Sequence, residues 1–267
     1  MKVIRSIIQN GAVFIAIFAA SIASAQVATS PPAETATAIP INYSTCHPKT
    51  SIEQLKKEAE EGRIEALRAL SSYYEEGCVN NNKLYLHYAR LAARVGNSLD
   101  AYQYASAVWQ VKGIAHALPL FKQAVLQGSM NAVDWLGDGY GSGSQGLPKN
   151  SDSAIYWYRI GAKRGNAYAI DRLIEMLGKS PQGERDNLVE ELAWIEVLLT
   201  MPPDYSFFPP AEYKNLLKDN AKLKPALQKV LNPDELRRME ILRNDFLQDI
   251  NADRNSSCAN SDRKSVV

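Results

Sequence analysis

Residues suited to catalysis or metal binding are scarce in this sequence. Its three histidines are His47, His87 and His116, and none has a cysteine or a second histidine at the spacing of zinc ligands. Signatures of a nucleophilic serine are missing, because the serines at 142 and 144 lie in a glycine-rich turn. Neighbouring carboxylates are common, but charged helix surfaces always supply them. We therefore predict no enzyme activity, no catalytic residue, no metal site and no cofactor.

Neither sign of charge is in excess. The chain has 30 Lys and Arg against 29 Asp and Glu, a formal net charge of +1. A near-neutral protein gives no electrostatic reason to expect binding to nucleic acid or to an anionic membrane surface. We therefore expect another protein as the partner, and no nucleic acid.

Long apolar runs are also rare, and one stands at the N-terminus. Two basic residues precede an apolar stretch, 12–23, and a small-residue site at Ala23–Ala25 follows it. This three-part order is typical of a secretory signal peptide, with cleavage expected before Gln26. An anchoring helix is the alternative, but the stretch is shorter than the ~20 residues that a bilayer core requires. We expect an exported, periplasmic protein without a membrane anchor in its mature chain.

The sequence has only three cysteines, Cys46, Cys78 and Cys258. In an exported protein this number indicates one disulfide and one remaining thiol, with three possible pairings. We favour Cys46–Cys78, because these two residues bracket one predicted helical hairpin, whereas Cys258 lies in a polar tail. In the chain-entropy model such a bond stabilises by about 3 kcal/mol.

What the sequence does have is an internal repeat. The segments "ALRALSSYYEEG" from Ala66 and "AVDWLGDGYGSG" from Ala132 share small and apolar residues at offsets 0, 4, 5, 8 and 11. Weaker copies begin at Ala101 and Ala169, so the starts are 35, 31 and 37 residues apart. A period in the thirties is typical of stacked helical hairpins.

The second half of each unit repeats as well. Apolar or small residues recur at offsets 0 and 5, and offsets of 4, 5 and 8 place side chains on one helical face. A glycine ends the pattern at offset 8, at Gly96, Gly128 and Gly165. A glycine in that place is a natural C-terminal helix cap. Each unit therefore reads as helix, turn, helix and cap, and the units must stack because one hairpin cannot bury its apolar face alone.

These repeats resemble the Sel-one-like repeat family, relatives of the tetratricopeptide repeats. The match is best over residues 132–165 and extends over about 50–180. The segment "LNPDELRRMEILRNDF" resembles the closing helix of such arrays, with Asn232 as N-cap, Pro233 at the first helical position and Glu235 completing a capping box. The resemblance implies an all-α solenoid of stacked helical hairpins with a C-terminal helical cap.

A glycine-rich stretch could be mistaken for a phosphate loop. Gly141, Gly143 and Gly146 match the dinucleotide-binding spacing G-x-G-x-x-G. That fingerprint must follow a strand and open a helix. Here it follows a predicted helix, and Pro148 interrupts it. We interpret the stretch as the turn between two helices of one repeat.

Together these patterns predict five regions. They are a signal peptide, a linker, the repeat array, a helical cap and a flexible tail, at 1–25, 26–49, 50–180, 181–250 and 251–267. Within the cap, the proline-bounded loop "PPDYSFFPP" contains Tyr205, Phe207 and Phe208. Two interpretations of these aromatic residues stay open, because they could anchor a partner or plug the end of the solenoid.

The first helix of each unit predicts a candidate binding face. At 100° per residue, offsets −1, 2, 6 and 9 lie opposite the core positions, and in tetratricopeptide arrays, which these repeats resemble, that side lines the concave groove. This face carries seven carboxylates and one arginine. Its candidate partner-binding residues are Glu65, Glu75, Asp100, Asp134, Asp138, Tyr168, Asp171 and Glu175. We predict that it captures a basic patch of a partner, the alternative being a solvated face with a chance excess of acid.

The resemblance also suggests a biological role. Exported proteins similar to this family include envelope regulators, assembly scaffolds and immunity proteins. A compact array without an enzyme domain favours a periplasmic immunity protein that neutralises a secreted antibacterial effector of the type VI kind. The alternative is an envelope regulator or an assembly scaffold of a secretion or polysaccharide system. This ranking rests on analogy of fold.

Overall fold

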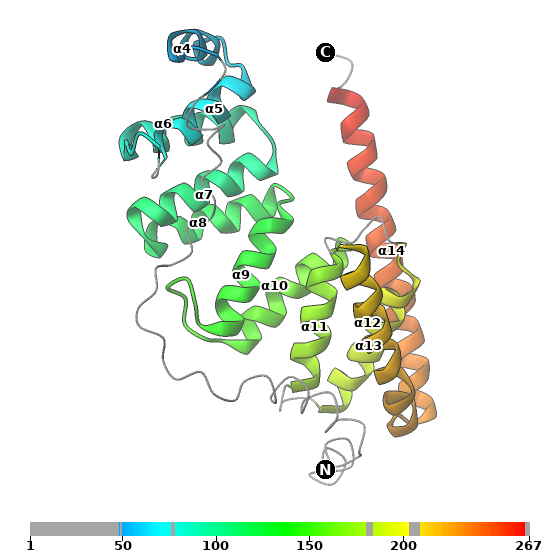
Figure 1. Cartoon of the computed structure of the whole chain (residues 1–267). Helices are drawn as coiled ribbons and strands as arrows, with labels where there is room; N and C mark the ends of the chain where they lie inside the picture. The colour runs from blue at the N-terminus through cyan, green and yellow to red at the C-terminus, as the bar shows by residue number, and fades with distance from the viewer. Residues whose placement is uncertain (1–47, 49, 76–77, 180–183, 203–208, 265–267) are drawn as a thin grey trace. The chain divides into compact units, whose positions relative to one another are not determined.

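The computed structural model describes residues 48, 50–75, 78–179, 184–202 and 209–264, without the side chains of Glu184 and of residues 254–264. By its contacts the chain divides into two units, 1–42 and 43–267, and all described residues belong to the second. Regular structure in this described part is helical throughout. The helices are α4 (Ile52–Glu60), α5 (Ile64–Tyr74), α6 (Asn82–Val95), α7 (Ser98–Lys112), α8 (Ile114–Leu126), α9 (Met130–Ser142), α10 (Ser151–Lys163), α11 (Ala167–Lys179), α12 (Glu184–Thr200), α13 (Pro210–Val230) and α14 (Pro233–Lys264) (Figure 1).

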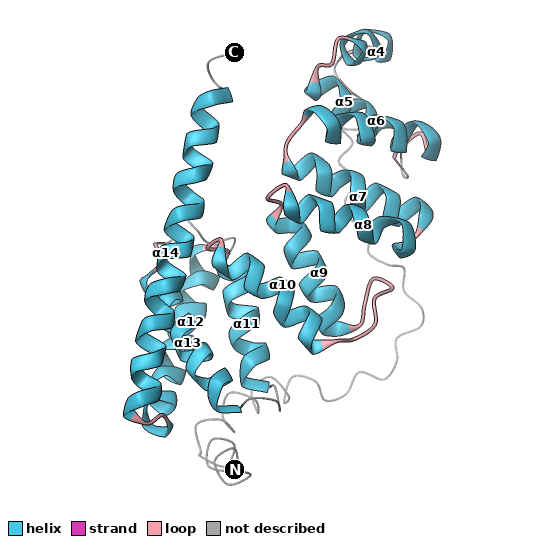
Figure 2. Ribbon diagram, turned by 180° about the vertical axis from the view of Figure 1, so that it is seen from behind, coloured by secondary structure: helices cyan, strands magenta, loops and turns pink. Residues whose placement is uncertain are grey.

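The helices form a stack of antiparallel hairpins. Helices α5 and α6, α7 and α8, and α9 and α10 pack as pairs, and each pair also packs on the next through α6 and α7, α8 and α9, or α10 and α11 (Figure 2). The first helices of successive units touch as well, α7 with α9 and α9 with α11. Helices α13 and α14 pack against α12. The predicted all-α array of hairpins with C-terminal helices is therefore confirmed.

Each hairpin-to-hairpin junction is a short cap that the sequence repeats. After the predicted capping glycine, a polar residue opens the next helix. The Asn97 side chain accepts hydrogen bonds from two amides at the start of α7, Ser129 Oγ accepts one from the amide of Ala132, and Asn166 Oδ1 accepts one from the amide of Ala169. Gly128 and Gly165 have φ angles of +93° and +77°, which favour glycine. The junctions therefore end one helix and start the next within about three residues.

The glycine-rich stretch is a turn between helices, as predicted. Helix α9 ends at Ser142, and Gly143 caps it in the left-handed region with φ of +75°. Hydrogen bonds to its backbone hold the loop in place: Trp109 Nε1 donates to the carbonyl of Gln145 at 3.2 Å. The amide of Asn150 donates to the carbonyl of Tyr140 at 2.8 Å. Helix α10 then begins at Ser151, so the stretch has neither the preceding strand nor the geometry of a phosphate loop.

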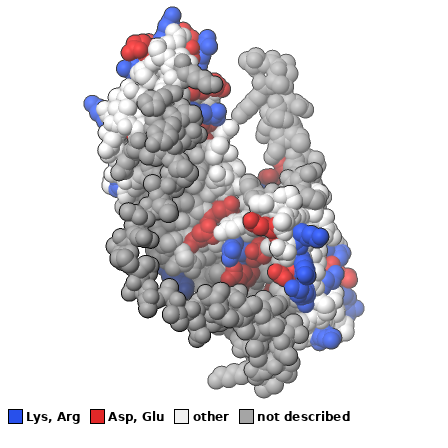
Figure 3. All heavy atoms as spheres, viewed as in Figure 1, with Lys and Arg blue, Asp and Glu red and all other residues white. Residues whose placement is uncertain are grey.

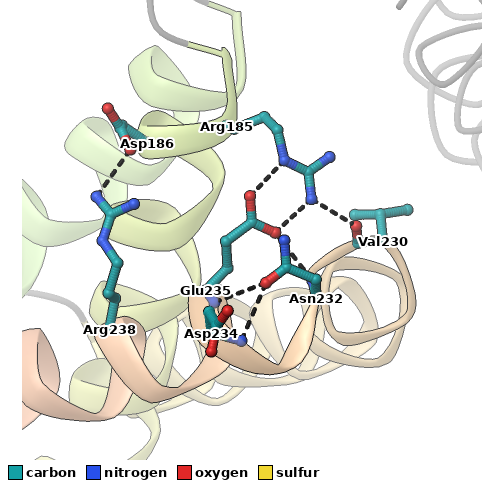
Figure 4. A network of polar contacts seen from close by, with 7 residues as sticks. All are labelled: Arg185, Asp186, Val230, Asn232, Asp234, Glu235 and Arg238. Carbon is teal, nitrogen blue, oxygen red and sulfur yellow. Dashed lines mark hydrogen bonds and ion pairs between the residues drawn. The ribbon is translucent and has the colours of Figure 1, made fainter.

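Helix α14 begins with the capping box that the sequence predicted. Asn232 Oδ1 accepts hydrogen bonds from the amides of Asp234 and Glu235, both at 3.0 Å, and the Asn232 amide donates to Glu235 Oε2 at 2.9 Å. Arg185, at the start of α12, adds two hydrogen bonds to the Glu235 carboxylate (Figure 4). This network fastens α14 to α12. Helix α14 continues to Lys264, so it includes most of the segment 251–267 that we predicted as a tail.

Candidate protein-binding surface

The centre of the candidate site is Asp138 on α9. Its carboxylate accepts a hydrogen bond from the Tyr158 hydroxyl at 2.7 Å and one from the Tyr168 hydroxyl, which lies 2.8 and 3.0 Å from its two oxygens. Tyr158 comes from α10 and Tyr168 from α11, so one carboxylate joins three helices. Burial and the bond to Asp138 raise the pKa of Tyr168 to about 12. Both tyrosines therefore stay protonated near neutral pH and act as hydrogen-bond donors.

One helical turn earlier, Asp134 faces the junction before α11. Asn166 Nδ2 donates to both of its carboxylate oxygens, at 3.0 and 3.2 Å. Asn166 is 2% exposed and caps α11 with its other side-chain atom. Burial raises the pKa of Asp134 to about 7, and nearby Asp138 adds to the rise, while the bond from Asn166 opposes it. Asp134 therefore carries only part of a charge at neutral pH.

This pKa predicts how the free energy of unfolding depends on pH. The folded pKa of about 7 lies above the ordinary value of 3.8, so the folded state binds the additional proton and Asp134 destabilises the fold as pH rises from about 4 to 7. Asp134→Asn is expected to raise the free energy of unfolding by about 1 kcal/mol at pH 8, after allowance for partial exposure, and to change it little at pH 4. Denaturant titration at both pH values measures this. Asp245→Asn, at an exposed position of α14, is the control, and equal gains at both pH values would contradict the prediction.

Sequence reasoning missed Arg172, which lies within the acidic group. Its guanidinium stands 5.3 Å from the centre of the Tyr168 ring, and its Nη1 is 2.5 Å from Glu175 Oε2. Lys179 Nζ is 2.5 Å from the other oxygen of Glu175. Arg172 stands at offset 3 of its repeat, beside the predicted face and not on it. Extending the predicted face by about 40° around the helix would have included offset 3, and with it Arg172.

Asp171 links this group to α13. Its Oδ1 accepts a weak hydrogen bond of 3.4 Å from Asn220 Nδ2, and burial raises its pKa. Glu175, by contrast, is exposed and bonds only within its own helix, and its pKa is lowered by Lys179 and Arg172 although burial opposes this. Glu175 is therefore the fully ionised carboxylate of the group that a partner can reach.

The N-terminal part of the predicted face differs. Asp100 is 4% exposed, and Arg68 donates to both of its oxygens at 2.7 and 2.8 Å. Burial opposes its ionisation, but the bonds from Arg68 and from the backbone of Asn97 lower its pKa. Asp100 is thus a buried link between α5 and α7 and is not available to a partner, contrary to our placement of it on an open face. Glu75 accepts a hydrogen bond of 3.4 Å from the Tyr85 hydroxyl. Glu65 is exposed.

These contacts share one cause. In three of the four units the residue at offset 2 is charged, namely Arg68, Asp134 and Asp171, and each bonds to a residue at the start of the next first helix or on α13. Successive first helices lie side by side along this face, so a side chain pointing away from its own core meets the next unit. A helical wheel treats each helix as isolated and cannot show this.

The structure therefore divides the eight candidate residues. It brings together a group that we call the acidic–tyrosine surface, which consists of Asp134, Asp138, Tyr168, Asp171, Arg172 and Glu175. Glu65, Glu75 and Asp100 lie apart from it on α5 and α7 or their ends. Figure 3 shows acidic side chains gathered over α9, α10 and α11, with basic ones among them.

Several predictions concern residues that the structure describes only in part or not at all. Tyr205, Phe207 and Phe208 lie outside the described residues. Cys78 is disulfide-bonded, but the side chains of Cys46 and Cys258 are not described, so the pairing Cys46–Cys78 stays a prediction. Within the described ranges, no group of His, Cys, Asp or Glu side chains could hold a metal ion. None of the helices there is both long and apolar enough to span a bilayer.

The hairpins, their junctions and the capped C-terminal helix define an all-α helical-repeat protein whose units resemble Sel-one-like repeats. No family model matches the chain, and no curated protein matches it either. Among solved structures it is similar to c5321, described as a protective antigen present in uropathogenic Escherichia coli strains displaying an SLR fold. The identity is 20% and the TM-score 0.49, over 74% of this chain and 41% of that one. This chain thus corresponds to less than half the length of c5321.

Proposed function

We propose that this chain is a scaffold that binds another protein through its acidic–tyrosine surface, and that the partner presents a basic patch. The observation that carries the proposal is the meeting of Asp138, Tyr168 and Glu175, from two successive units, on one partly exposed face. Helical-repeat arrays bind partners over such faces. Aromatic side chains beside charges are also frequent anchors of protein interfaces.

The charges of this surface set what it can bind. Asp134 is partly protonated because of its raised pKa of about 7, and Glu175 is ionised. Arg172 and Lys179 offset part of the negative charge through their ion pairs with Glu175. A partner's arginine or lysine could compete for Glu175 while stacking beside Tyr168. Charge of this kind chiefly speeds association and selects the partner.

Within this class, we place the protein in the periplasm, and its partner is a secreted antibacterial effector that it neutralises as an immunity protein. The support is the signal-like N-terminus in the sequence and the single array. An envelope regulator or assembly scaffold is the second candidate. A neighbouring effector gene supports the first, whereas a neighbouring secretion or polysaccharide operon supports the second. The proposed action is binding and not catalysis, since the carboxylates of Asp100, Asp134 and Asp138 accept hydrogen bonds from side chains of neighbouring segments.

The test uses a substitution that leaves the bonds between helices in place. Asp134, Asp138 and Asp171 accept hydrogen bonds from other helices, so changing them would disturb the fold. Glu175→Lys removes only bonds within α11. With the partner captured from the host periplasm, this variant is expected to associate about tenfold more slowly at low salt and with weaker salt dependence.

The matched control is Glu240→Lys, which makes the same charge change at an exposed position of α14. Association rates measured by biolayer interferometry at several salt concentrations distinguish the two. Equal rates for both variants would mean that the partner binds another surface. The segment containing Phe207 and Phe208, which on its sequence could anchor a partner, is the next candidate in that case.

A further inference from the structure

A second charged surface lies on a different part of the array. From residue 78 to residue 133 the chain has five cationic residues, Lys83, Arg90, Arg94, Lys112 and Lys122, and a single acidic residue, Asp100. Asp100 is buried against Arg68. The exposed charge of this stretch is therefore positive, although the whole chain is nearly neutral.

Helix α6 carries three of these cations, together with His87, on one face. Lys83, His87, Arg90 and Arg94 are all exposed, and their spacings of four, three and four residues place them along one side of the helix. At 1.5 Å per residue the row is about 16 Å long. The opposite side buries Tyr85, Ala89 and Ala92 against α5 and α7. We call this row the basic ridge.

The cations of the basic ridge are not neutralised by their surroundings. Helix α6 contains no acidic residue, and among the ion pairs found between described residues none involves Lys83, Arg90 or Arg94. Elsewhere in the array the half-buried Arg172 and the exposed Lys179 do pair, with Glu175 in their own helix. The ridge therefore keeps its full charge for an external group.

One end of the ridge is apolar. Val95 is the last residue of α6 and is 57% exposed, and Leu99 is the second residue of α7 and is 46% exposed. They flank the short turn from α6 to α7, which follows directly after Arg94 (Figure 2). Two exposed aliphatic side chains thus stand at this end of α6, to one side of the row, since Val95 lies about 100° around the helix from Arg94.

We propose that the basic ridge and its apolar end bind an acidic helix of a protein partner. The occupant lies along α6, and carboxylates spaced three and four residues apart on its face pair with Lys83, Arg90 and Arg94. An aliphatic side chain at one of its ends covers Val95 and Leu99. The contact joins charge complementarity along the helix with apolar burial at one end, as helix-in-groove recognition does.

The shape of the ridge favours a rod-like partner over a lipid surface. A bilayer touching the exposed Val95 and Leu99 at the α6–α7 turn would reach Arg94 and Arg90, but Lys83 lies about 16 Å back along the helix axis. A helix lying alongside α6 reaches all of the cations at once. The ridge is also separate from the acidic–tyrosine surface, which lies on α9 and α11, so either surface could exist without the other.

The test uses two synthetic alanine-rich helical peptides of about 20 residues, long enough to form a helix in water. One carries four glutamates spaced four, three and four residues apart, followed by a leucine. The other has the same composition with the glutamates distributed around the helix. Fluorescence anisotropy at low salt is expected to show at least about fivefold tighter binding of the first peptide. NMR chemical-shift changes caused by this peptide are expected at the residues of α6 and at Leu99.

Variants of the protein assign the binding to the ridge. The double variant Arg90→Glu with Arg94→Glu is expected to bind the first peptide about tenfold or more weakly. It is expected to bind instead a peptide in which lysines replace the glutamates. Lys214→Glu with Lys218→Glu, an equal charge change at exposed positions of α13, is expected to weaken it less than about twofold. Because Arg90 and Arg94 are exposed and form no ion pair within the described part, their replacement leaves the fold intact, which circular dichroism checks.

Three results would overturn the proposal. The first is equal binding of the two peptides, and the second is an equal loss in the α13 control, since both mean unspecific attraction. The third is binding to vesicles containing phosphatidylglycerol that depends on Arg90 and Arg94 while the peptide does not bind, which would identify a lipid surface. Glu175→Lys is expected to leave peptide binding unchanged, so this test is independent of the proposed function.

Discussion

Replacing Glu235 with alanine is expected to lower the free energy of unfolding by about 2 kcal/mol at neutral pH, since it breaks a partly buried ion pair and a helix cap together. Glu235 is 8% exposed. Its carboxylate accepts two hydrogen bonds from Arg185 and one from the amide of Asn232 (Figure 4). Without it, Arg185 keeps only the carbonyl of Val230, at 3.1 Å, as a partner.

The effect of this substitution is expected to depend on pH. The bonds from Arg185 and Asn232 lower the pKa of Glu235 to about 2, against an ordinary value of 4.5. The folded state thus holds its proton less tightly than the unfolded state, so the stabilisation is complete above about pH 4.5 and is lost as pH falls toward 2. Urea titrations of wild type and Glu235→Ala at pH 7 and pH 3 are expected to show the difference shrinking.

Two controls separate this network from a general loss of charge. Glu240→Ala removes an exposed carboxylate from the same helix and is expected to change the free energy of unfolding by less than about 0.5 kcal/mol. Arg185→Met, alone and with Glu235→Ala, completes a double-mutant cycle whose coupling measures the pair itself. A loss in Glu235→Ala no larger than in Glu240→Ala would mean that the network does not hold α14 in place.

The helices and their ends could be predicted because their signals are local. The capping box of Asn232 and Glu235 lies within four residues, and the glycines that end each hairpin recur with the repeat. Apolar spacing within single helices set the hairpins. Arg185 was missed because its partner Glu235 lies 50 residues away in sequence. No pattern within either segment marks such a pair, which only the packing of α12 on α14 creates.

The candidate site shows the same limit at the level of one surface. The helical wheel predicted Asp138, Tyr168 and Glu175 for one face, and in the structure the Tyr168 hydroxyl donates to Asp138. It could not show that Asp100 is paired with Arg68, or that Asp134 accepts hydrogen bonds from Asn166, because each of these partners belongs to a neighbouring unit. Similarly, the net charge of the whole chain sums the cations of α6 with acidic residues elsewhere, so it does not reveal the basic ridge. A count of charges over successive segments would have revealed the stretch from 78 to 133.

The second large effect is expected at Gly137, where α9 meets α10. A Cβ atom at Gly137 would lie 2.4 Å from Tyr158 Cε1 and 2.7 Å from Cδ1. Tyr158 is 3% exposed and its hydroxyl bonds to Asp138, so the ring cannot move aside without opening the core and losing that bond. Gly137→Ala is therefore expected to lower the free energy of unfolding by about 2 kcal/mol, despite the better helix propensity of alanine.

Gly141, four residues later in the same helix, provides the matched substitution. A Cβ there would meet Ala154 Cβ at 3.7 Å and the Tyr158 hydroxyl at 3.8 Å, which are ordinary contacts. Gly141→Ala is therefore expected to raise the free energy of unfolding by about 0.5 kcal/mol through helix propensity alone. Urea titration of both variants gives opposite signs if the close approach of α9 and α10 requires glycine at 137. If both variants were stabilised, α10 would have room to move away from α9, and the position of Tyr158 against Asp138 would not be fixed by this packing.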